Sequence, residues 1–156
     1  MLFTQEDVEA YIEQEDVKFI RLAFCDLTGK QKNISIMPQE LGRAFSQGIS
    51  FDASAVAGFG DVVESDLLLF PIPSTLSAMP WRPSRGKVVR MFCEIRYPDG
   101  RPFPLDCRAL LKQAVRAGEE QGISVQIGAE FEFYLFKTDE DGNPTTQPFD
   151  HAGYMD

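Results

Sequence analysis

Two carboxylates two residues apart, Glu130 and Glu132, stand in the middle of an apolar segment that runs from Val125 to Leu135. The alternation of residue types predicts a strand, and side chains alternate between the two faces of a strand. Glu130 and Glu132 therefore share one face, and a hydrophobic core is expected on the other. Like charges about 7 Å apart repel each other unless water or cations screen them. One or two divalent cations would do this; the alternative is a solvated outer face of an antiparallel strand.

Asp52 is a second candidate, because it is a lone carboxylate among the small and apolar residues from Ile49 to Asp61. This segment is too irregular to predict as a helix or a strand, and so apolar a loop is expected to be covered by another surface. A partly buried aspartate could bind a cation or act as a base, since burial raises its pKa and a nearby cation lowers it. The alternative is a turn aspartate that bonds to its own backbone.

Composition and charge exclude several classes of function. The 156 residues carry a formal net charge of −9, with 44% hydrophobic and 25% charged residues, which is typical of a soluble globular protein. The sequence shows no basic patch of the kind expected in a nucleic-acid-binding protein. The segment from Met1 to Glu15 is acidic where a signal peptide would be basic, and no apolar run approaches membrane-spanning length. We therefore predict a cytoplasmic protein that binds neither nucleic acid nor a membrane.

The cysteines, the histidine and the tryptophan of the sequence do not predict a further catalytic or metal-binding site. Cys25, Cys93 and Cys107 are widely spaced and form no CxxC pair, which argues against a disulfide framework or a zinc knuckle and fits a reducing compartment. His151 is the single histidine and is expected at the surface. Trp81, in a polar loop, either anchors an interface or packs on its own sheet.

The elements before Phe103 predict a small α+β sheet with one main helix. Thr4 and Asp7 are expected to cap a short N-terminal helix. Asp26–Gly29 has the composition of a hairpin turn between two alternating strands. Pro38 fits the first position of the main helix. The predicted strands span 17–24, 32–37, 67–70 and 87–95, and the main helix spans 38–47.

The composition changes at Phe103-Pro104, and the residues after this point predict the beginning of another domain. Residues 106–121 have the pattern of an amphipathic helix with Leu110 and Leu111 facing inward. The strand with the two glutamates comes next, and then an acidic turn at Asp139 that we interpret as an exposed hairpin. One helix and one or two strands cannot bury their own apolar faces. The chain is therefore expected to stop partway into this second domain.

Taken together, these segments resemble glutamine synthetase of the bacterial type I kind, over nearly the whole chain from about Val17 to Asp156. The order and spacing of the segments make the resemblance specific. The segments that carry it are Lys18–Leu22, Asp26–Gly29, Gly48–Ser54, Glu64–Leu67, Pro98–Gly100, Gly128–Phe136 and His151–Asp156.

The resemblance implies an α+β fold: a β-grasp N-terminal domain at residues 1–103, and at 104–156 the first helix and strand of a catalytic domain that would continue far past residue 156. It implies an ATP-dependent ligase, in which the carboxylate of glutamate is phosphorylated and ammonia then displaces phosphate. Magnesium or manganese would offset charge on the phosphates and on the substrate carboxylate. The remaining metal ligands and most substrate contacts lie outside this sequence, so the chain alone is expected to be inactive.

The resemblance also implies roles for the candidate residues. Glu130 and Glu132 match the family's metal-binding positions, one for each of two metal sites. Asp52 matches the aspartate that helps to bind and deprotonate ammonium, a residue that in the family enters the active site of the neighbouring subunit. The implied partners are glutamate, ammonium and ATP, together with further copies of the chain in stacked rings.

Three positions depart from the family pattern. Ala53 and Ala55 stand where the family usually has glycine and serine, and Phe131 stands where a proline usually separates the two glutamates. Because alanine lacks the backbone freedom of glycine, ammonium is less firmly implied than metal binding. Two alternatives stay open: a ligase of the same family that joins glutamate to another amine, and a non-catalytic module that docks on a full-length ligase and whose gene would end after Asp156.

Overall fold

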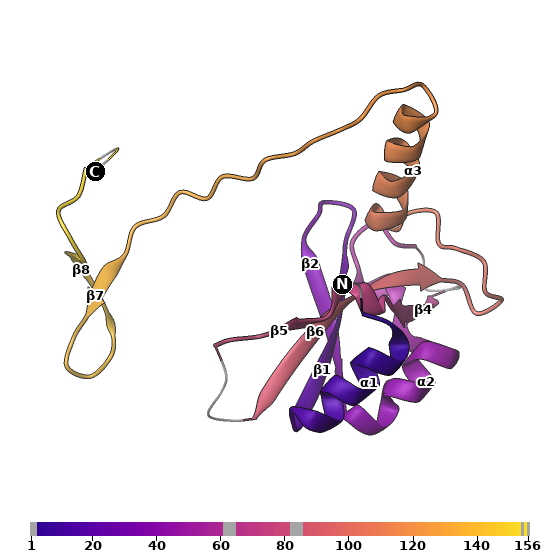
Figure 1. The fold of residues 1–156 in the computed structure, drawn as a ribbon, viewed down its shortest axis with the longest axis horizontal. Helices are drawn as coiled ribbons and strands as arrows, with labels where there is room; N and C mark the ends of the chain where they lie inside the picture. Colours follow the sequence, from indigo (N-terminus) through magenta and orange to yellow (C-terminus); the bar gives the residue numbers. More distant parts are fainter. Residues whose placement is uncertain (1–2, 61–64, 82–85, 154, 156) are drawn as a thin grey trace. The chain divides into compact units, whose positions relative to one another are not determined.

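The structure, a computed structural model, describes residues 3–60, 65–81, 86–153 and 155. The chain divides into two compact units, Met1–Ile123 and Ser124–Asp156. The first unit contains a mixed sheet with helices, and the second contains a two-stranded hairpin (Figure 1). The predicted α+β class is therefore confirmed.

A six-stranded sheet organises the first unit. Its strands are β1 (Val17–Cys25), β2 (Gln31–Ile36), β3 (Ile49–Asp52), β4 (Asp66–Pro71), β5 (Ser77–Ala78) and β6 (Lys87–Arg96). The strand order is β2-β1-β6-β4-β3, and β5 pairs with β6 beside this path. β1 and β6 run parallel, and the other pairs are antiparallel. The four strands predicted from the sequence are β1, β2, β4 and β6, each correct to within one residue at either end.

Three α-helices accompany this sheet. The helices α1 (Gln5–Gln14) and α2 (Leu41–Ser46) pack on it, and α3 (Cys107–Glu119) follows β6 in the chain (Figure 1). The predicted cap of α1 is confirmed: the Asp7 amide donates to the Thr4 hydroxyl at 3.2 Å, and the Thr4 amide donates to Asp7 Oδ2 at 2.8 Å. Each of these bonds satisfies a backbone donor that would otherwise lack a partner at the helix start.

The core lies between the sheet and the two helices α1 and α2. Alternate side chains of β6 from Val89 to Ile95 are buried, as the strand period requires. The rings of Phe24 and Phe51 meet with centroids 4.8 Å apart, which links β1 to β3. The buried residues of this core include Ile20, Leu22, Leu67, Leu69, Met91, Cys93 and Ile95 from the strands, and Val8, Ile12, Leu41 and Ala44 from the helices.

Among the described residues, three short 3-10 helices lie at the ends of elements of the first unit. Pro38–Glu40 forms a 3-10 turn before α2, so the predicted helix 38–47 begins with tighter winding than an α-helix. Ala53–Ala55 and Pro73–Thr75 form 3-10 turns after β3 and β4. The strand β5 lies shortly before Trp81, where the sequence predicts a polar loop.

The described part of the apolar segment, residues 49–60, contains more regular structure than its sequence predicts. Its first residues form β3, which pairs with β4 so that Phe51 lies opposite Leu67. The cover expected for this apolar segment comes from the first unit itself, because its large apolar side chains are buried in the core of that unit. These buried side chains are Ile49, Phe51, Val56 and Phe59.

The strand predicted from Val125 to Leu135 is absent from the described structure, and this part of the prediction is wrong. Residues 125–135 belong to no helix or strand. The side chains of Ile127, Phe131 and Phe133 are 81%, 85% and 75% exposed. A strand needs a neighbour for its backbone hydrogen bonds and cover for its apolar face, and the described residues supply neither. Leu110 and Leu111 of α3, which were predicted to face inward, are likewise exposed, because no described residue covers them.

Hydrogen bonds in the second unit stabilise one hairpin, formed by β7 (Phe136–Thr138) and β8 (Pro144–Pro148). Asp139 sets the turn between these strands, since its Oδ1 accepts bonds from the Asp141 amide at 3.0 Å and the Asn143 amide at 2.8 Å. These bonds lower the pKa of Asp139. The interpretation of this acidic turn as an exposed hairpin is confirmed.

Substituting Gly48 by alanine is expected to destabilise the first unit by about 1–3 kcal/mol. Gly48 ends α2 with φ +76°, and an added Cβ would lie 2.9 Å from Phe70 Cε2 and 3.1 Å from Leu68 Cβ. Gly42→Ala is the matched control, because Gly42 lies inside α2 and a Cβ there meets open space. Urea denaturation followed by circular dichroism would measure both, and equal midpoints would contradict the predicted strain.

Candidate functional site

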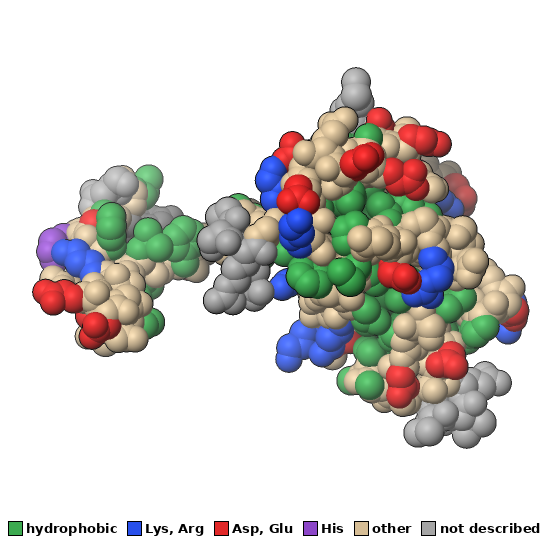
Figure 2. Space-filling view, turned by 90° about the horizontal axis from the view of Figure 1, so that it is seen from below, with side chains coloured by type: hydrophobic (Ala, Val, Ile, Leu, Met, Phe, Trp, Pro, Cys, Tyr) green, Lys and Arg blue, Asp and Glu red, His purple; other side chains and the backbone are tan. Residues whose placement is uncertain are grey.

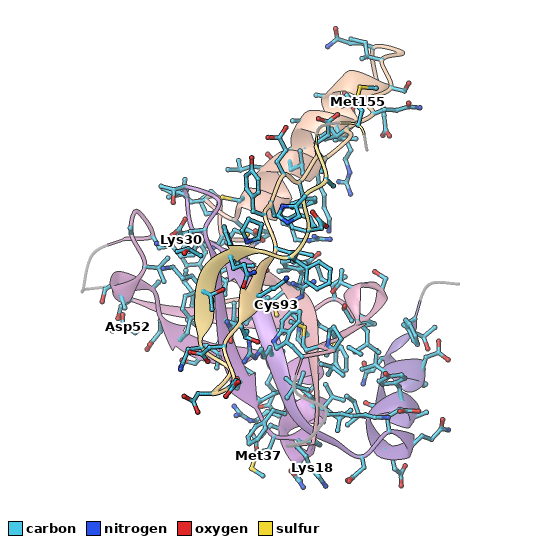
Figure 3. The ribbon with its side chains drawn as sticks, turned by 90° about the vertical axis from the view of Figure 1, so that its left-hand side faces the viewer. Lys18, Lys30, Met37, Asp52, Cys93 and Met155 are labelled. Carbon is cyan, nitrogen blue, oxygen red and sulfur yellow. The ribbon has the colours of Figure 1, made fainter. Side chains whose placement is uncertain are left out.

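Asp52 is the last residue of β3, and its side chain is exposed at the surface of the first unit (Figure 3). Its Oδ1 accepts hydrogen bonds from the Ser54 amide at 2.9 Å and from the Ser54 hydroxyl at 2.6 Å. These bonds cap the 3-10 turn Ala53–Ala55. Asp52 is therefore not partly buried, and the alternative, an aspartate that bonds to its own turn, describes its local structure.

Hydrogen bonding keeps Asp52 charged. The Ser54 hydroxyl, and after it the Ser54 amide, hold the pKa of the Asp52 carboxyl below its ordinary value, with a smaller contribution from the Ser65 side chain. At neutral pH the group is thus a carboxylate with one oxygen occupied by the turn.

Removing the Ser54 hydroxyl is expected to raise the pKa of Asp52 towards its ordinary value, because that hydroxyl is the main cause of the lowering. Carbon-detected NMR titration of the Asp52 carboxyl in wild type and Ser54→Ala would measure the shift. Ser50→Ala serves as a control, because this exposed serine of β3 donates no hydrogen bond to Asp52. Identical titration curves for wild type and Ser54→Ala would contradict the assignment.

Two neighbours of Asp52 were missed by the sequence reasoning. Asp66 lies directly opposite Asp52 in the antiparallel pair of β3 and β4, and the carbonyl oxygen of Ser65 accepts a bond from the Ala53 amide at 2.7 Å. The register between β3 and β4 brings these residues together, and this register cannot be predicted from the residues near Asp52 alone. Facing like charges across strands destabilise the pair unless they are screened, so this end of the sheet favours the approach of a cation.

Glu130 and Glu132 lie in the irregular segment of the second unit, and both side chains are exposed. Carboxylate oxygens are the ligands that magnesium and manganese prefer, so the donor chemistry fits such ions. These ions take about six ligands, and two glutamates supply only part of such a set. Among the described residues, no group of three or more histidine, cysteine, aspartate or glutamate side chains is placed to hold a metal.

The other candidates are at the surface or in the core. His151 is exposed, as predicted, and Trp81 is 64% exposed. Cys93 is buried, and burial raises the pKa of its thiol far above the ordinary value. Cys25 is only partly buried, and desolvation is again the main cause of its raised pKa. Neither thiol has the depressed pKa of a nucleophile.

Comparison with protein families gives two matches in sequence order. The model described as "Glutamine synthetase, beta-Grasp domain" matches residues 16–98, and the model described as "Glutamine synthetase, catalytic domain" matches residues 104–155. The chain belongs to the glutamine synthetase family. The predicted β-grasp fold of the N-terminal part is confirmed by the first match together with the mixed sheet described above.

Curated relatives of this family match almost the whole chain. The glutamine synthetase of Methanosarcina mazei is 44% identical over 153 residues, which cover 98% of this chain and 34% of that protein. The glutamine synthetases of Clostridium saccharobutylicum and Thermotoga maritima are 42% and 37% identical, and the matches cover 99% and 98% of this chain and 35% of each relative. The chain thus spans about a third of the length of these relatives.

Two solved structures have a fold similar to that of this chain. A GmaS/ADP complex has a TM-score of 0.65 at 24% identity, covering 74% of this chain and 26% of the other. The glutamine synthetase of Plasmodium falciparum has a TM-score of 0.67 at 20% identity, covering 76% and 23%. At these identities the likeness concerns the fold alone. No described helix has both the length and the apolar character needed to cross a membrane.

Proposed function

We propose that this chain is the N-terminal part of an ATP-dependent glutamate–ammonia ligase. The observation that carries the proposal is the pair of family matches, residues 16–98 and 104–155, which follow each other in the order of the two domains of glutamine synthetase. On this proposal the β-grasp domain occupies residues 1–103 and the catalytic domain begins at residue 104. The free state of all three cysteines fits the reducing cytoplasm.

The proposed reaction has two steps. The γ-carboxylate of glutamate attacks the terminal phosphorus of ATP, which gives γ-glutamyl phosphate and ADP. Ammonia then attacks the activated carbonyl carbon, the C–O bond to phosphate breaks, and glutamine and phosphate leave. Bound magnesium or manganese supplies charge neutralisation at the phosphoryl group. Glu130 and Glu132 would hold these ions, together with ligands from outside this chain.

Asp52 would act on ammonium in the second step. Its lowered pKa keeps it anionic, so the carboxylate could hold an ammonium ion. In a water-excluded site the carboxylate would accept the proton that converts ammonium into nucleophilic ammonia. The exposure of Asp52 at the end of β3 supports the further proposal that it completes the site of a neighbouring subunit in a ring.

A ligase of the same family that uses another amine is the second candidate, and Ala53 and Ala55 favour it. The structure accommodates both alanines: they form part of a 3-10 turn, and neither has a positive φ. Alanine at these positions therefore introduces no backbone strain. Its effect would be to present Cβ atoms and to omit one hydroxyl beside Asp52, which suits a less polar amine.

The test is an assay of the full-length product of the native gene. We expect glutamine to form from glutamate, ammonium and Mg-ATP, with ADP released in equal amount, and no turnover by the 156-residue chain alone. Methylamine and ethylamine at matched concentration distinguish the second candidate, because that enzyme would prefer them to ammonium. A native gene that ends after Asp156 and yields an inert product would contradict both ligase proposals and favour a docking module.

A further inference from the structure

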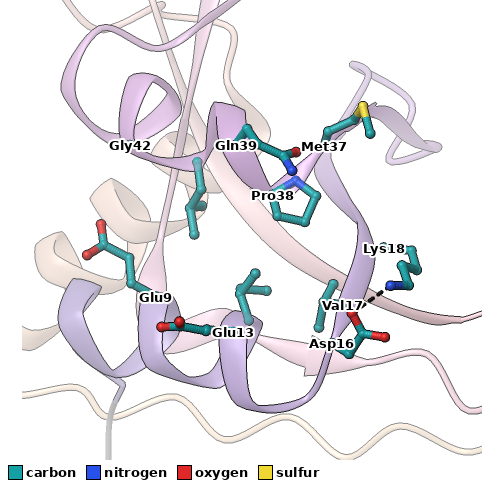
Figure 4. Close-up of a pocket in the computed structure, with 11 residues that line it drawn as sticks. Glu9, Glu13, Asp16, Val17, Lys18, Met37, Pro38, Gln39 and Gly42 are labelled. Carbon is teal, nitrogen blue, oxygen red and sulfur yellow. Dashed lines mark hydrogen bonds and ion pairs between the residues drawn. The ribbon is translucent and has the colours of Figure 1, made fainter.

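A hollow of about 620 Å³ lies in the first unit between α1, the start of β1 and the segment from Met37 to Gly42 (Figure 4). Its apolar floor is made by the edges of core residues, Ile12 from α1 and Leu41 from α2. This volume lies within the range of ligand-binding pockets. Neither Asp52 nor the two glutamates line it, so the hollow is separate from the candidate site.

The rim of the hollow is acidic. Glu9, Glu13 and Asp16 line it and carry the negative charge, and the one cationic lining residue, Lys18, is already bonded to Asp16 Oδ1 at 2.6 Å. Glu9 and Glu13 stand one helical turn apart, where like charges repel. The last turn of α1 contains no basic residue to offset the negative end of its dipole. Glu9 accepts a hydrogen bond from the neutral Gln5 amide at 2.9 Å, and Lys18 is bonded to Asp16. A further cation placed here would relieve both effects.

The hollow also offers apolar contact. Met37 lines it with 55% of its surface exposed, and its flexible thioether side chain can adapt to different partners. Beside it, the position of a Cβ on Gly42 meets open space. Figure 2 shows acidic and hydrophobic side chains side by side over one face of the first unit. An occupant must therefore combine positive charge with an apolar surface.

We propose that this hollow docks a cationic amphipathic segment of a partner protein. Its apolar side chains would pack on Met37 and into the space beside Gly42, and its lysine or arginine groups would face Glu9, Glu13 and Asp16. Charge complementarity selects this occupant, because the lining residues carry three carboxylates and a single ammonium that is paired internally. Peptide helices commonly bind in hydrophobic grooves in this way. The net charge of −9 would also speed their approach.

The probe is a synthetic helix of lysine and leucine with one apolar face, added to the ¹⁵N-labelled chain at low salt. We expect amide shifts confined to α1 and to residues 37–42, and binding that weakens as salt screens the charges. The double variant Glu9→Gln, Glu13→Gln is expected to weaken binding about 3- to 10-fold, as two exposed ion pairs would. Glu119→Gln, Glu120→Gln removes the same charge from α3 and should leave binding unchanged.

Gly42→Leu tests the apolar part, because its side chain would enter the open space without meeting a neighbour at Cβ. We expect about 10-fold weaker binding, whereas Gly118→Leu, which adds the same side chain to α3, should have no effect. Shifts centred elsewhere, equal binding of a scrambled peptide, or binding of spermidine as tight as that of the helix would overturn the proposal. Dimerisation of the chain through this face without peptide would also overturn it.

Discussion

Replacing Asp106 by alanine is expected to lower the free energy of unfolding of the first unit by about 2–4 kcal/mol. Asp106 is 4% exposed and joins two elements. Its Oδ1 accepts a bond from the Arg108 amide at 3.0 Å, which caps α3, and its Oδ2 accepts a bond from the Ile95 amide of β6 at 3.2 Å. The alanine variant loses the cap and leaves a buried amide of the sheet without this acceptor.

Asp99→Ala is the matched control for this prediction. Asp99 also accepts a bond from a backbone amide, that of Arg101 at 3.0 Å, but it lies in an exposed turn where water can replace the carboxylate. Urea denaturation of both variants followed by circular dichroism would compare them. Asp106→Asn, which keeps one acceptor oxygen, should fall between alanine and wild type. Equal unfolding midpoints for Asp99→Ala and Asp106→Ala would show that burial of the Asp106 bonds adds no stability.

The strands and turns of the first unit are largely predictable from sequence because alternation along a strand and turn residues are local signals. Asp26 illustrates this: it accepts bonds from the Thr28 and Lys30 amides at 2.9 Å each, and Gly29 takes φ +80° in the turn that joins β1 to β2. A turn aspartate and a glycine of this kind are local signals. The short strand β3 gives no such signal, since four residues are too few to define an alternation, and it forms by pairing with β4.

The strand prediction at Glu130 and Glu132 failed for a different physical reason. Alternation indicates which side chains of a strand would be buried, but it does not say what would bury them. Phe131 and Phe133, which were expected to face a core, are exposed because no described element pairs with or covers their segment. The same reasoning applies to α3, whose amphipathic pattern correctly predicts a helix and whose apolar face has no described partner.

The candidate site shows the same division between local and non-local information. The type and position of Asp52 were recognised from sequence, and its turn with Ser54 follows a local rule. The facing carboxylate of Asp66 depends on register between two strands, which no nearby residue encodes. The exposure of Asp52 depends on which of its neighbours enter the core. Sequence therefore proposed Asp52 as a candidate, and the structure was needed to describe its surroundings.

In the proposed full-length ligase, Asp52→Asn is expected to lower kcat/KM for ammonium by about 10²- to 10⁴-fold. Asparagine keeps the shape and a carbonyl oxygen that can accept from Ser54, so the turn persists while the charge and the basicity are lost. Asp66→Asn is the matched control, because it removes the same charge from the facing position on β4. Steady-state rates of glutamine formation against ammonium concentration would measure both. An Asp52→Asn enzyme with wild-type kcat/KM would remove Asp52 from the proposed mechanism.

Co-expression of two inactive variants tests whether Asp52 acts across a subunit boundary. Glu130→Gln is expected to inactivate the site in its own subunit, and Asp52→Asn the site of its neighbour. In mixed rings about a quarter of the sites would then combine an intact Asp52 from one subunit with an intact Glu130 from the next, so activity should return to about that fraction. If Asp52 instead served its own subunit, every site would contain one of the two substitutions and mixing would restore nothing. Recovery therefore requires both the assembly and the division of roles between the two carboxylates.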